Sequence, residues 1–359
     1  IVLNPPFAYS LSSSFSEHQP KGTHILSFIW PAGEPMLAGT GGSETFTAGH
    51  VRELLRRGIA AQVVFVQRGA RASQRDFPDI PCLELERQEM ISELPGKVVF
   101  INHAYPVPTK QKAAIILHCA IPSVREREAR KRDVAGRTII ATSIYNAQQW
   151  ALYLGIHSSD INVVMPFADP VFGSVVRSKP TKKIRVLYAG RLHPEKGIYT
   201  VLEMMHKHEM KQLDIAMTIV MAGQHVESGQ VIARMLQSYP YARLLPPVRD
   251  VRSMAELLAR TDILLMPSVY EEPFGMLSVE AQHAGCRVIA SSLGGLPETN
   301  CGLLTLVEQR NPLAIIGGIR TAALLGAATK KERARANTHF GLQSSVNEFL
   351  GSVKDRYMV

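Results

Sequence analysis

Two successive series of short apolar segments, separated by helical patterns, constrain the fold of this chain more than any other feature. The first series lies within residues 24–143 and the second within residues 183–291. Parallel strands that are covered on both faces are continuously apolar in this way, and a helix between successive strands is typical of a doubly wound sheet. The sequence therefore predicts an α/β protein with two Rossmann-like, doubly wound parallel-sheet domains that face a deep cleft.

The individual elements follow from the same patterns. Strands are expected at residues 24–30, 61–66, 98–102, 114–119, 138–143, 183–189, 215–222, 243–245, 262–267 and 287–291. Helices are expected at residues 44–57, 199–207, 229–237, 251–260 and 276–284. Ligands of doubly wound sheets bind beyond the carboxyl ends of the strands, so the polar residues that follow these strands are the first candidates for a site.

Length and composition set the expected domain boundaries. The 359 residues fit two domains, because a domain takes about 150 residues. Residues 1–23 are rich in Ser and Pro and are expected to form an irregular extension, while residues 171–182 are expected to be a linker. The two domains are then expected at residues 24–170 and 183–335, and a C-terminal helix within residues 336–359 is expected to pack back on the first domain.

Charge and cysteine content disfavour several classes of protein. The net charge of +9 is spread evenly along the chain, which favours phosphorylated small molecules or an anionic membrane surface over nucleic acid as partners. The chain has no apolar run of about 18 residues, so we expect a cytoplasmic protein, with peripheral contact at the inner membrane face as an option. The four cysteines lie far apart without a C-x-x-C pair, which argues against a zinc site and a disulfide framework. The oligomeric state stays open.

The strongest functional signal is residues 270–280, Y-E-E-P-F-G-M-L-S-V-E, which follow an expected strand. They place Glu272 and Glu280 on either side of a turn that opens a helix. Side chains in a helix lean toward its N-terminus, so Glu280 is expected to point back toward Glu272, where both carboxylates can accept hydrogen bonds from sugar hydroxyls. Acidic side chains that merely complement the helix dipole are the alternative. The free backbone N–H groups expected at the helix start, which suit phosphate or sugar oxygens, belong to Phe274, Gly275 and Met276.

The second signal is residues 188–197, Y-A-G-R-L-H-P-E-K-G, again after an apolar strand. Arg191 offers a planar fork and Lys196 a mobile point charge, a pair that suits a diphosphate whose negative charge rises as it departs. Gly190 and Gly197 allow close approach of the backbone. A solvated basic turn is the alternative for this segment taken alone.

Together, these segments resemble the retaining glycosyltransferases of family 4, which have the two-domain GT-B architecture and use nucleotide-sugar donors. The resemblance covers residues 24–330. It implies a hexosyltransferase of carbohydrate biosynthesis that transfers a sugar from a UDP- or GDP-sugar to a hydroxyl of a sugar, a glycolipid or a small molecule. The elements in the family's order and spacing are G-R-x-x-x-x-K at Arg191 and Lys196, E-x7-E at Glu272 and Glu280, and S-S-L-G-G-L-P-E at residues 291–298.

The resemblance also implies roles for single residues of the second domain. Arg191 and Lys196 would hold the donor diphosphate, Glu272 would face the transferred sugar, and Glu280 would take the ribose hydroxyls. Same-face attack, in which the leaving phosphate oxygen helps to deprotonate the acceptor, would give retention. Further donor contacts are implied for Gly190, Phe274, Gly275, Met276, Gly223 and Val248, and a pocket-shaping role for Gly294 and Gly295.

The first domain matches the family less closely. Gly41 and Gly42, in G-T-G-G-S-E, match the Gly-Gly loop that lies opposite the donor phosphates, and the lack of G-x-G-x-x-G disfavours a nicotinamide enzyme. His118, in I-L-H-C-A, matches the catalytic histidine that approaches the sugar near C6, with a structural histidine as the alternative. His103 and Tyr105, in I-N-H-A-Y-P, are weaker candidates for the acceptor side.

Two segments depart from the family's sequence pattern, and they weaken the assignment of the acceptor more than the assignment of the reaction class. Residues 165–169 read M-P-F-A-D where the family usually has P-N-G-V-D, and Cys119 stands where many relatives have an acid. Both positions lie outside the elements that hold the donor phosphates. The chain also has no D-x-D motif, so a reaction without metal or other cofactor is expected.

Two other functions fit parts of the sequence. A GT-B nucleotide-sugar epimerase would share the architecture, but it needs acid/base carboxylates in the first domain that the sequence does not place. A non-catalytic, nucleotide-binding surface adaptor is suggested by the basic residues of V-R-E-R-E-A-R-K-R-D, at 124–133, which could touch anionic lipid. Acids interleave with these bases, so a solvated helix face is the simpler interpretation of that segment.

Overall fold

The computed structural model describes residues 25–31, 33–222 and 226–354. The extension expected at residues 1–23 lies outside these ranges. The described residues up to Met165 and from Leu342 onward form one compact unit, and Pro166–Gly341 form a second. Each unit is built around a parallel sheet of its own.

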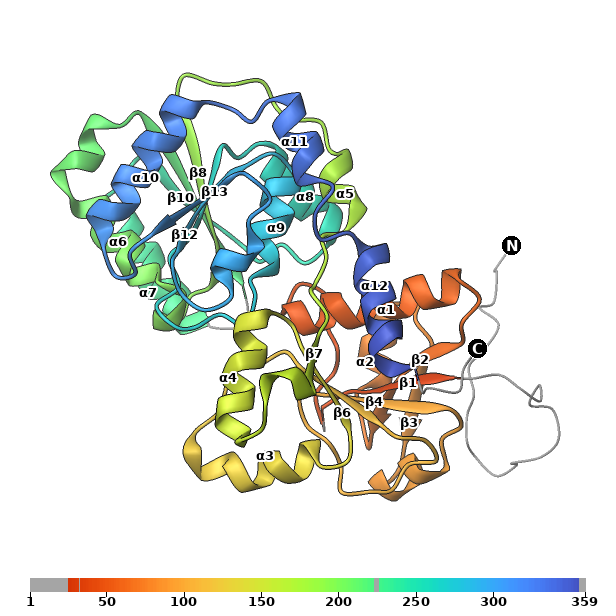
Figure 1. Ribbon diagram of the computed structural model, residues 1–359. Helices are drawn as coiled ribbons and strands as arrows, with labels where there is room; N and C mark the ends of the chain where they lie inside the picture. The colour runs from red at the N-terminus through yellow and green to blue at the C-terminus, as the bar shows by residue number, and fades with distance from the viewer. Residues whose placement is uncertain (1–24, 32, 223–225, 355–359) are drawn as a thin grey trace. The chain divides into compact units, whose positions relative to one another are not determined.

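The first unit contains a seven-stranded sheet in the order β3-β2-β1-β4-β5-β6-β7 (Figure 1). The order reverses between β1 and β4, and a doubly wound sheet opens to its ligand at such a reversal. The strands are β1 (Leu26–Ile29), β2 (Ala61–Val66), β3 (Cys82–Leu85), β4 (Lys97–Ile101), β5 (Ala114–Leu117), β6 (Thr138–Ala141) and β7 (Ile161–Val163). The α-helices are α1 (Gly42–Arg56), α2 (Ala70–Asp76), α3 (Arg127–Val134), α4 (Ile144–Leu154) and α12 (Leu342–Val353).

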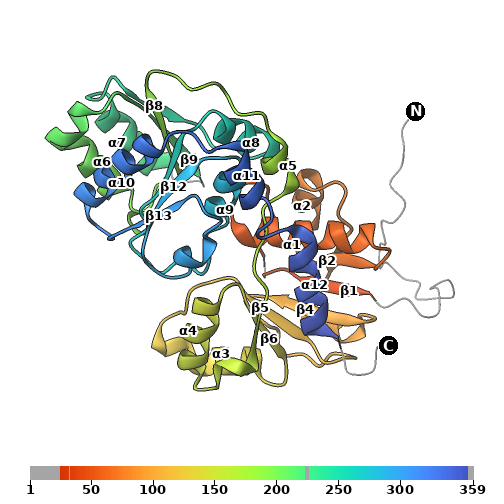
Figure 2. The ribbon, with the colours of Figure 1, turned by 45° about the horizontal axis from the view of Figure 1, so that its top comes forward.

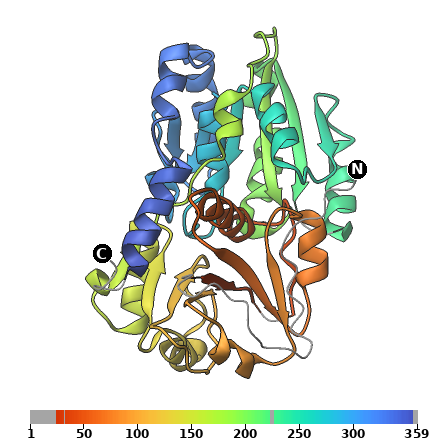
Figure 3. The ribbon, with the colours of Figure 1, turned by 90° about the vertical axis from the view of Figure 1, so that its right-hand side faces the viewer.

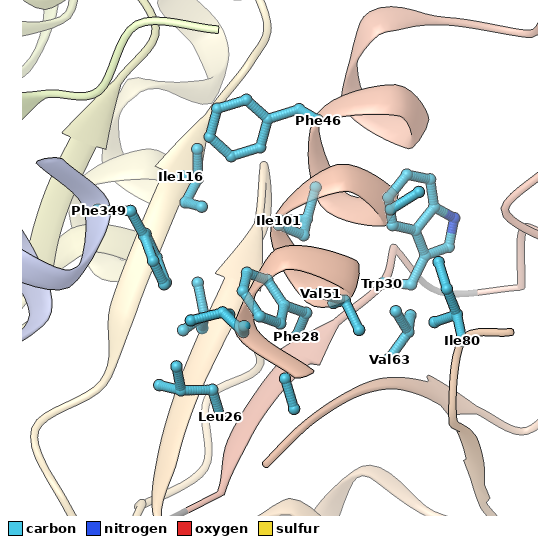
Figure 4. Packing of buried hydrophobic residues seen from close by; sticks show 14 of the residues in the cluster. Leu26, Phe28, Trp30, Phe46, Val51, Val63, Ile80, Ile101, Ile116 and Phe349 are labelled. Carbon is cyan, nitrogen blue, oxygen red and sulfur yellow. The ribbon is translucent and has the colours of Figure 1, made fainter. Parts of the chain in front are cut away.

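Both faces of the first sheet are buried, which explains the continuously apolar strands. Neighbouring residues of β1 enter different cores: Phe28 packs with α1 on one face, and Ile29 packs with α4 on the other. Helix α12 lies beside α1 (Figure 2), and Phe349 of α12 stacks on Phe28 with ring centroids 5.5 Å apart (Figure 4). Helix α2 lies on the same side of the strands as α1 (Figure 3). Three helices therefore cover one face of this sheet.

The second unit contains a six-stranded parallel sheet in the order β10-β9-β8-β11-β12-β13. Helices cover both faces: α6, α7 and α10 lie on one side, and α8, α9 and α11 on the other (Figure 1). The strands are β8 (Ile184–Arg191), β9 (Ile215–Ala222), β10 (Ala242–Leu245), β11 (Ile263–Met266), β12 (Arg287–Ser291) and β13 (Leu304–Val307). The α-helices are α5 (Pro170–Ser174), α6 (Ile198–His206), α7 (Val226–Leu236), α8 (Val251–Ala259), α9 (Met276–His283), α10 (Pro312–Leu325) and α11 (Lys330–Ala336).

The order of the second sheet reverses between β8 and β11, which pair directly. The connection from β8 leads through α6 to one side of the sheet, and the connection from β11 leads through α9 to the other. The two loops that follow β8 and β11 therefore diverge from neighbouring strand ends. This is the position at which a doubly wound sheet binds its ligand, and both strong sequence signals lie there.

The structure contains elements that the sequence patterns did not predict. Strands β3, β7 and β13 are edge strands with the sequences C-L-E-L, I-N-V and L-T-L-V. Helix α5 lies at the start of the segment expected as a linker, where the Oδ1 of Asp169 accepts a hydrogen bond from the Val171 N–H at 2.9 Å. A capping carboxylate and a proline in the first turn are enough to begin a helix of this length.

Candidate functional site

The loop after β8 is folded tightly against the loop after β11. The Tyr188 hydroxyl lies 3.2 Å from the backbone oxygens of both Arg191 and Lys196, which closes the loop on itself. Gly197 follows with a φ of +75°, and a Cβ atom there would collide with the Pro267 carbonyl oxygen. Only glycine meets both conditions. The sequence therefore brings Lys196 up to the end of β11.

Glu272 is the centre of the hydrogen-bond network in this unit. Its side chain is only 9% exposed, and its Oε1 accepts hydrogen bonds from Lys196 Nζ and from Ser268 Oγ, each at 2.6 Å. Its Oε2 accepts a hydrogen bond from the Tyr270 hydroxyl at 2.8 Å. A buried carboxylate needs a paired cation and hydrogen-bond donors, and Glu272 has both.

The two basic residues of the loop differ in their surroundings. The Lys196 ammonium also donates to the Tyr270 hydroxyl at 2.8 Å and lies 4.6 Å from the centre of the Tyr270 ring. Arg191 is exposed, and within the described residues its guanidinium makes no hydrogen bond or ion pair. Arg191 lies close enough to Tyr270 for its charge to act on the hydroxyl, although burial and Glu272 together raise the Tyr270 pKa. One cation is therefore held in place, and the other is available to a ligand.

The double glycine of residues 291–298 packs on the backbone of Glu272. Gly294 has a φ of +63°, and a Cβ atom there would lie 2.6 Å from both the N and the O of Glu272. The Gly295 N–H donates to the Glu272 carbonyl oxygen at 2.7 Å, and a Cβ on Gly295 would collide with the Pro273 carbonyl oxygen. These glycines therefore hold the chain of Glu272 in place.

Glu280 lies on α9, apart from the Lys196–Glu272 pair. Its carboxyl makes no hydrogen bond or ion pair with any residue that the structure describes, so the expected approach to Glu272 is not a direct contact. Loss of hydration, followed by the negative charge of Asp169, raises the Glu280 pKa to about 8. The carboxyl is therefore mostly protonated at neutral pH, when it can both donate and accept a hydrogen bond.

The other residues expected at the donor lie around these loops. Phe274 is 3% exposed and packs edge-on against Phe340, with ring centroids 5.4 Å apart. Gly275 caps the N-terminus of α9 with a φ of +116°, and Met276 is the first residue of that helix. Gly190 lies in β8 and Val248 in the loop between β10 and α8, while Gly223 lies outside the described residues.

In the first unit, His118 follows the carboxyl end of β5. Its backbone N–H donates to Asn102 Oδ1 at 2.8 Å, and its ring meets Phe46 edge-on at 4.7 Å between centroids. Burial, and to a smaller extent the nearby His50, lowers the His118 pKa to about 3. The ring is thus neutral, and its Nε2 is buried without a hydrogen-bond partner among the described residues. A ligand hydroxyl could supply that partner.

His50 supports the same region from inside the core, a role that the sequence patterns did not reveal. Its Nδ1 lies 2.9 Å from the Phe46 carbonyl oxygen, and its Nε2 lies 3.3 Å from the Ser345 Oγ of α12. The His50 ring stacks on Phe46 at 3.9 Å between centroids. Burial lowers its pKa to about 4, so this histidine is neutral as well. Phe46 thus lies between two uncharged imidazoles.

His103 and Tyr105 follow β4, at the point where the order of the first sheet reverses. His103 Nε2 lies 3.1 Å from a guanidinium nitrogen of Arg130, and burial together with that charge lowers the His103 pKa. The Tyr105 hydroxyl is buried without a hydrogen-bond partner among the described residues. Both residues therefore lie where a ligand of the first sheet would bind.

Gly41 and Gly42 begin α1. Gly41 is the N-cap and has a φ of −172°, which is extended backbone that any residue adopts. A Cβ atom on Gly41 would come within 2.8 Å of only the carboxylate tip of Glu44, whose Oε1 accepts a hydrogen bond from Thr40 at 3.0 Å. The fold therefore does not require glycine at position 41 in the way it does at position 294.

The described part of the chain lacks two features, a metal-binding cluster and a membrane-spanning helix. Among these residues, no cluster of three His, Cys, Asp or Glu side chains has the arrangement of a metal site. No helix there is both long and apolar enough to cross a bilayer.

Comparison with known proteins identifies the family. Residues 174–339 match the family described as Glycosyl transferases group 1. This region, which lies within the second unit, belongs to the group 1 glycosyltransferases. The matched region contains both basic residues of the β8 loop, Glu272, Glu280 and the double glycine, so the resemblance found in these motifs is confirmed.

The chain matches curated relatives over part of their length. The D-inositol 3-phosphate glycosyltransferase of Corynebacterium kroppenstedtii is 28% identical over 218 residues, which cover 54% of this chain and 48% of that protein. The chain therefore spans about half the length of the curated relatives it matches.

Solved glycosyltransferase structures share the fold across nearly the whole chain. A glycosyltransferase from Rickettsia africae matches with a TM-score of 0.76 and 17% identity over 92% of this chain and 97% of its own. HepE of Anabaena, solved in complex with UDP, matches with a TM-score of 0.71 and 15% identity over 92% and 99% of the two chains. These likenesses confirm the predicted GT-B architecture.

Within the second unit, the structure brings some of the expected site residues together and not others. Lys196 and Glu272 form an ion pair, and Arg191 lies near them, whereas Glu280 stands apart on α9. Sequence patterns assigned no role to Tyr188, Ser268 or Tyr270, although each contacts the expected residues. Tyr188 and Tyr270 are the first residues of the two motif segments and Ser268 lies two residues before the second, and this position is the signal that could have found them.

Proposed function

We propose that this protein is a retaining glycosyltransferase that moves a hexose from a nucleoside diphosphate sugar to a hydroxyl acceptor without a metal. The ion pair between Lys196 and Glu272, at the carboxyl ends of neighbouring strands, is the observation that carries the proposal. It places an ammonium for a diphosphate and a carboxylate for sugar hydroxyls next to each other. UDP-glucose is the favoured donor, because HepE of Anabaena is solved with UDP-glucose bound.

The donor diphosphate is held by the chain's own cations. Arg191 has a guanidinium that no described residue occupies, and Lys196 is only partly exposed, at 20% of its side chain. A cation in a partly buried site interacts more strongly with phosphate than one in bulk water. The backbone N–H groups at the start of α9 add donors, and the protonated Glu280 carboxyl can hydrogen-bond to both ribose hydroxyls.

In the transfer step, the bond between the sugar C1 and the β-phosphate oxygen breaks, and its electron pair leaves with the diphosphate. The acceptor oxygen forms the new bond to C1 on the same face, and its proton passes to the departing phosphate oxygen. Negative charge on that oxygen rises before the proton arrives, so Lys196 and Arg191 stabilise the transition state more than the ground state.

The first unit offers neutral polar groups that suit hydroxyls. The buried, unpartnered Nε2 of His118 suits a sugar hydroxyl, which can donate to an unprotonated ring nitrogen. His103 and Tyr105 are the proposed acceptor contacts, and the acceptor class stays open among sugars, glycolipids and small molecules. Protein in the cytoplasm or at the inner membrane face would have access to such donors.

Nucleotide binding tests the donor part of this proposal. UDP and UDP-glucose are expected to raise the thermal unfolding midpoint, and a ligand at 100 times its Kd stabilises the folded state by about 2.7 kcal/mol. GDP, ADP and their glucose conjugates serve as the comparison set. The proposal is wrong if none of the six ligands changes the midpoint.

Product analysis tests the reaction itself. The protein is incubated with UDP-glucose and a panel of hydroxyl acceptors, and NMR reads the anomeric configuration of the product. Retention of the donor's configuration and an unchanged rate in EDTA are expected. An inverted product would contradict retention, loss of activity in EDTA would contradict metal independence, and a C2-epimerised nucleotide sugar would favour the epimerase.

A further inference from the structure

Tyr270 forms hydrogen bonds with both members of the Lys196–Glu272 ion pair. Its hydroxyl accepts a hydrogen bond from Lys196 Nζ and donates one to Glu272 Oε2, both at 2.8 Å. A phenol has one proton to donate and lone pairs to accept, so this single hydroxyl is satisfied by one cation and one anion. The Lys196 ammonium also lies 4.6 Å from the centre of the same ring. Tyr270 therefore contacts Lys196 both through its hydroxyl and through its ring.

The hydrogen bonds of the Lys196 ammonium can be counted. It has three N–H donors. One donates to Glu272 Oε1 at 2.6 Å and one to the Tyr270 hydroxyl at 2.8 Å. The third has no acceptor among the described residues. Two fixed bonds on a flexible four-carbon side chain thus determine the direction of the third N–H.

Glu272 alone would hold Lys196 less well. A bond to one carboxylate oxygen fixes the distance of the ammonium but leaves its rotation about that bond free. Glu272 is itself expected to face the transferred sugar, and a sugar hydroxyl that binds it would compete with Lys196. The Tyr270 hydroxyl gives the ammonium a second anchor that bears no full charge.

We propose that Tyr270 is a positioning residue that directs the Lys196 ammonium at the departing diphosphate through its hydroxyl. This inference rests on the proposed function, because it assigns Lys196 to the leaving group. Tyr270 itself touches neither the reacting atoms nor the sugar in this scheme. The geometry thus adds an uncharged member to a site that the sequence describes only by its charged residues.

The test is a double-mutant cycle on UDP-glucose consumption, measured as UDP release. Tyr270→Phe keeps the ring and its volume but removes the hydroxyl, and kcat/KM is expected to fall about tenfold to a hundredfold, the effect of losing a hydrogen bond to a charged group. Tyr270→Phe should lower kcat more than it raises KM, because the hydrogen bond between Tyr270 and Lys196 matters most when charge develops on the leaving group. In a Lys196→Ala background, the same change should have less than a twofold further effect.

Tyr199→Phe is the matched control, because Tyr199 is an exposed tyrosine of α6 in the same unit, with 53% of the residue accessible. It should leave kcat and KM within twofold of the wild type. The thermal unfolding midpoint of Tyr270→Phe, together with its Kd for UDP, separates a positioning effect from damage to the fold. A midpoint close to that of the wild type is expected, with a Kd changed less than kcat.

Three outcomes would overturn the inference. If Tyr270→Phe turns over UDP-glucose within twofold of the wild type while Lys196→Ala is impaired, Tyr270 does not position Lys196, although the proposed function stands. If Tyr270→Phe lowers kcat/KM by the same factor in the wild type and in the Lys196→Ala variant, the Tyr270 hydroxyl does not act through Lys196. If the wild type neither binds UDP, GDP or ADP nor consumes their glucose conjugates, the proposed function is wrong, and the assignment of Tyr270 falls with it.

Discussion

The second unit has paired charges among its candidate residues, whereas the first unit has neutral groups that lack hydrogen-bond partners among the described residues. In the second unit, Lys196 Nζ lies 2.6 Å from Glu272 Oε1. Tyr270 hydrogen-bonds to Lys196, and Ser268 hydrogen-bonds to Glu272. In the first unit, the Nε2 of His118 and the hydroxyl of Tyr105 are buried without partners among the described residues. The two sets of groups suit ligand groups of different charge.

This difference follows from the chemistry of a nucleotide sugar. The leaving diphosphate gains negative charge in the reaction, so the groups that face it should be cations held in fixed positions. Sugar hydroxyls carry no charge and can donate to a neutral imidazole or hydrogen-bond with a phenol. The charged unit, which is the second unit, therefore suits a diphosphate, and the neutral unit, which is the first unit, suits uncharged hydroxyls.

The largest expected effect tests the charged unit. Lys196→Ala should lower the rate of sugar transfer by at least about a hundredfold, the scale of removing one donor that stabilises transition-state charge. Lys207→Ala is the matched control, because Lys207 is a partly exposed lysine of the same unit that forms an i,i+4 ion pair with Glu203. Steady-state rates of Lys196→Ala within threefold of the wild type would remove the charged unit from the mechanism.

The second prediction compares glycines in the two units. Gly294→Ala should lower kcat/KM about tenfold and the unfolding midpoint by about 4–8 °C, because its Cβ would lie 2.6 Å from the Glu272 backbone at a φ of +63°. Gly41→Ala should leave the midpoint within about 1 °C, because its φ of −172° is extended and only the tip of Glu44 must move.

The two glycine variants also separate a ligand requirement from a folding requirement. If the donor phosphates approach Gly41 as the family resemblance implies, Gly41→Ala should raise KM for the donor without loss of stability. Equal thermal shifts in the two variants would contradict the difference between the two units.

The fold was predictable where strands are buried on both faces. Central strands β2, β9 and β12 have the predicted boundaries, because their apolar runs are continuous. The three missed strands, β3, β7 and β13, are all at sheet edges. An edge strand is covered less completely, so it can be as short as three or four residues and can carry polar side chains such as Glu84 and Asn162. Hydrophobic pattern alone does not separate such segments from loops.

The site was predictable in its residues and less so in their contacts. The motifs placed Arg191, Lys196 and Glu272 after strands, but the ion pair requires that β8 and β11 be neighbours, and strand order is not written in local sequence. Glu280 shows the opposite case. Helical side chains lean toward the N-terminus of the helix, which predicts that Glu280 points toward Glu272. In the structure, the charged group that acts on Glu280 is Asp169, from a distant segment of the chain.

The third prediction concerns how acid changes the stability of the first unit, through His118. The His118 pKa of about 3 lies below the ordinary value of 6.5, so between these pH values the unfolded chain binds more protons than the folded one. Stability should therefore fall as the pH drops below about 6.5. His118→Phe should reduce the loss of the unfolding midpoint between pH 6.5 and 5 by about 3 °C, the effect of roughly 1 kcal/mol.

The matched control for this prediction is His157→Phe, at an exposed histidine of the same unit. It should unfold with the same pH dependence as the wild type. A His118→Phe variant that loses stability in acid as steeply as the wild type would show that His118 is not the buried, neutral group on which the comparison depends.

The last prediction concerns Glu280 in the second unit, where the pH dependence of stability has the opposite sign. The Glu280 pKa of about 8 lies above the ordinary value of 4.5, so the folded protein binds more protons than the unfolded chain between these pH values, and stability falls as the pH rises through this range. Glu280→Gln removes the titration, so the midpoint of this variant relative to that of the wild type should be higher at pH 8 than at pH 5. Glu203→Gln, at an exposed carboxylate of the same unit, controls for the loss of a surface charge. A gap between Glu280→Gln and the wild type that stays constant with pH would contradict the raised pKa, and with it the expectation that the two units respond to acid in opposite directions.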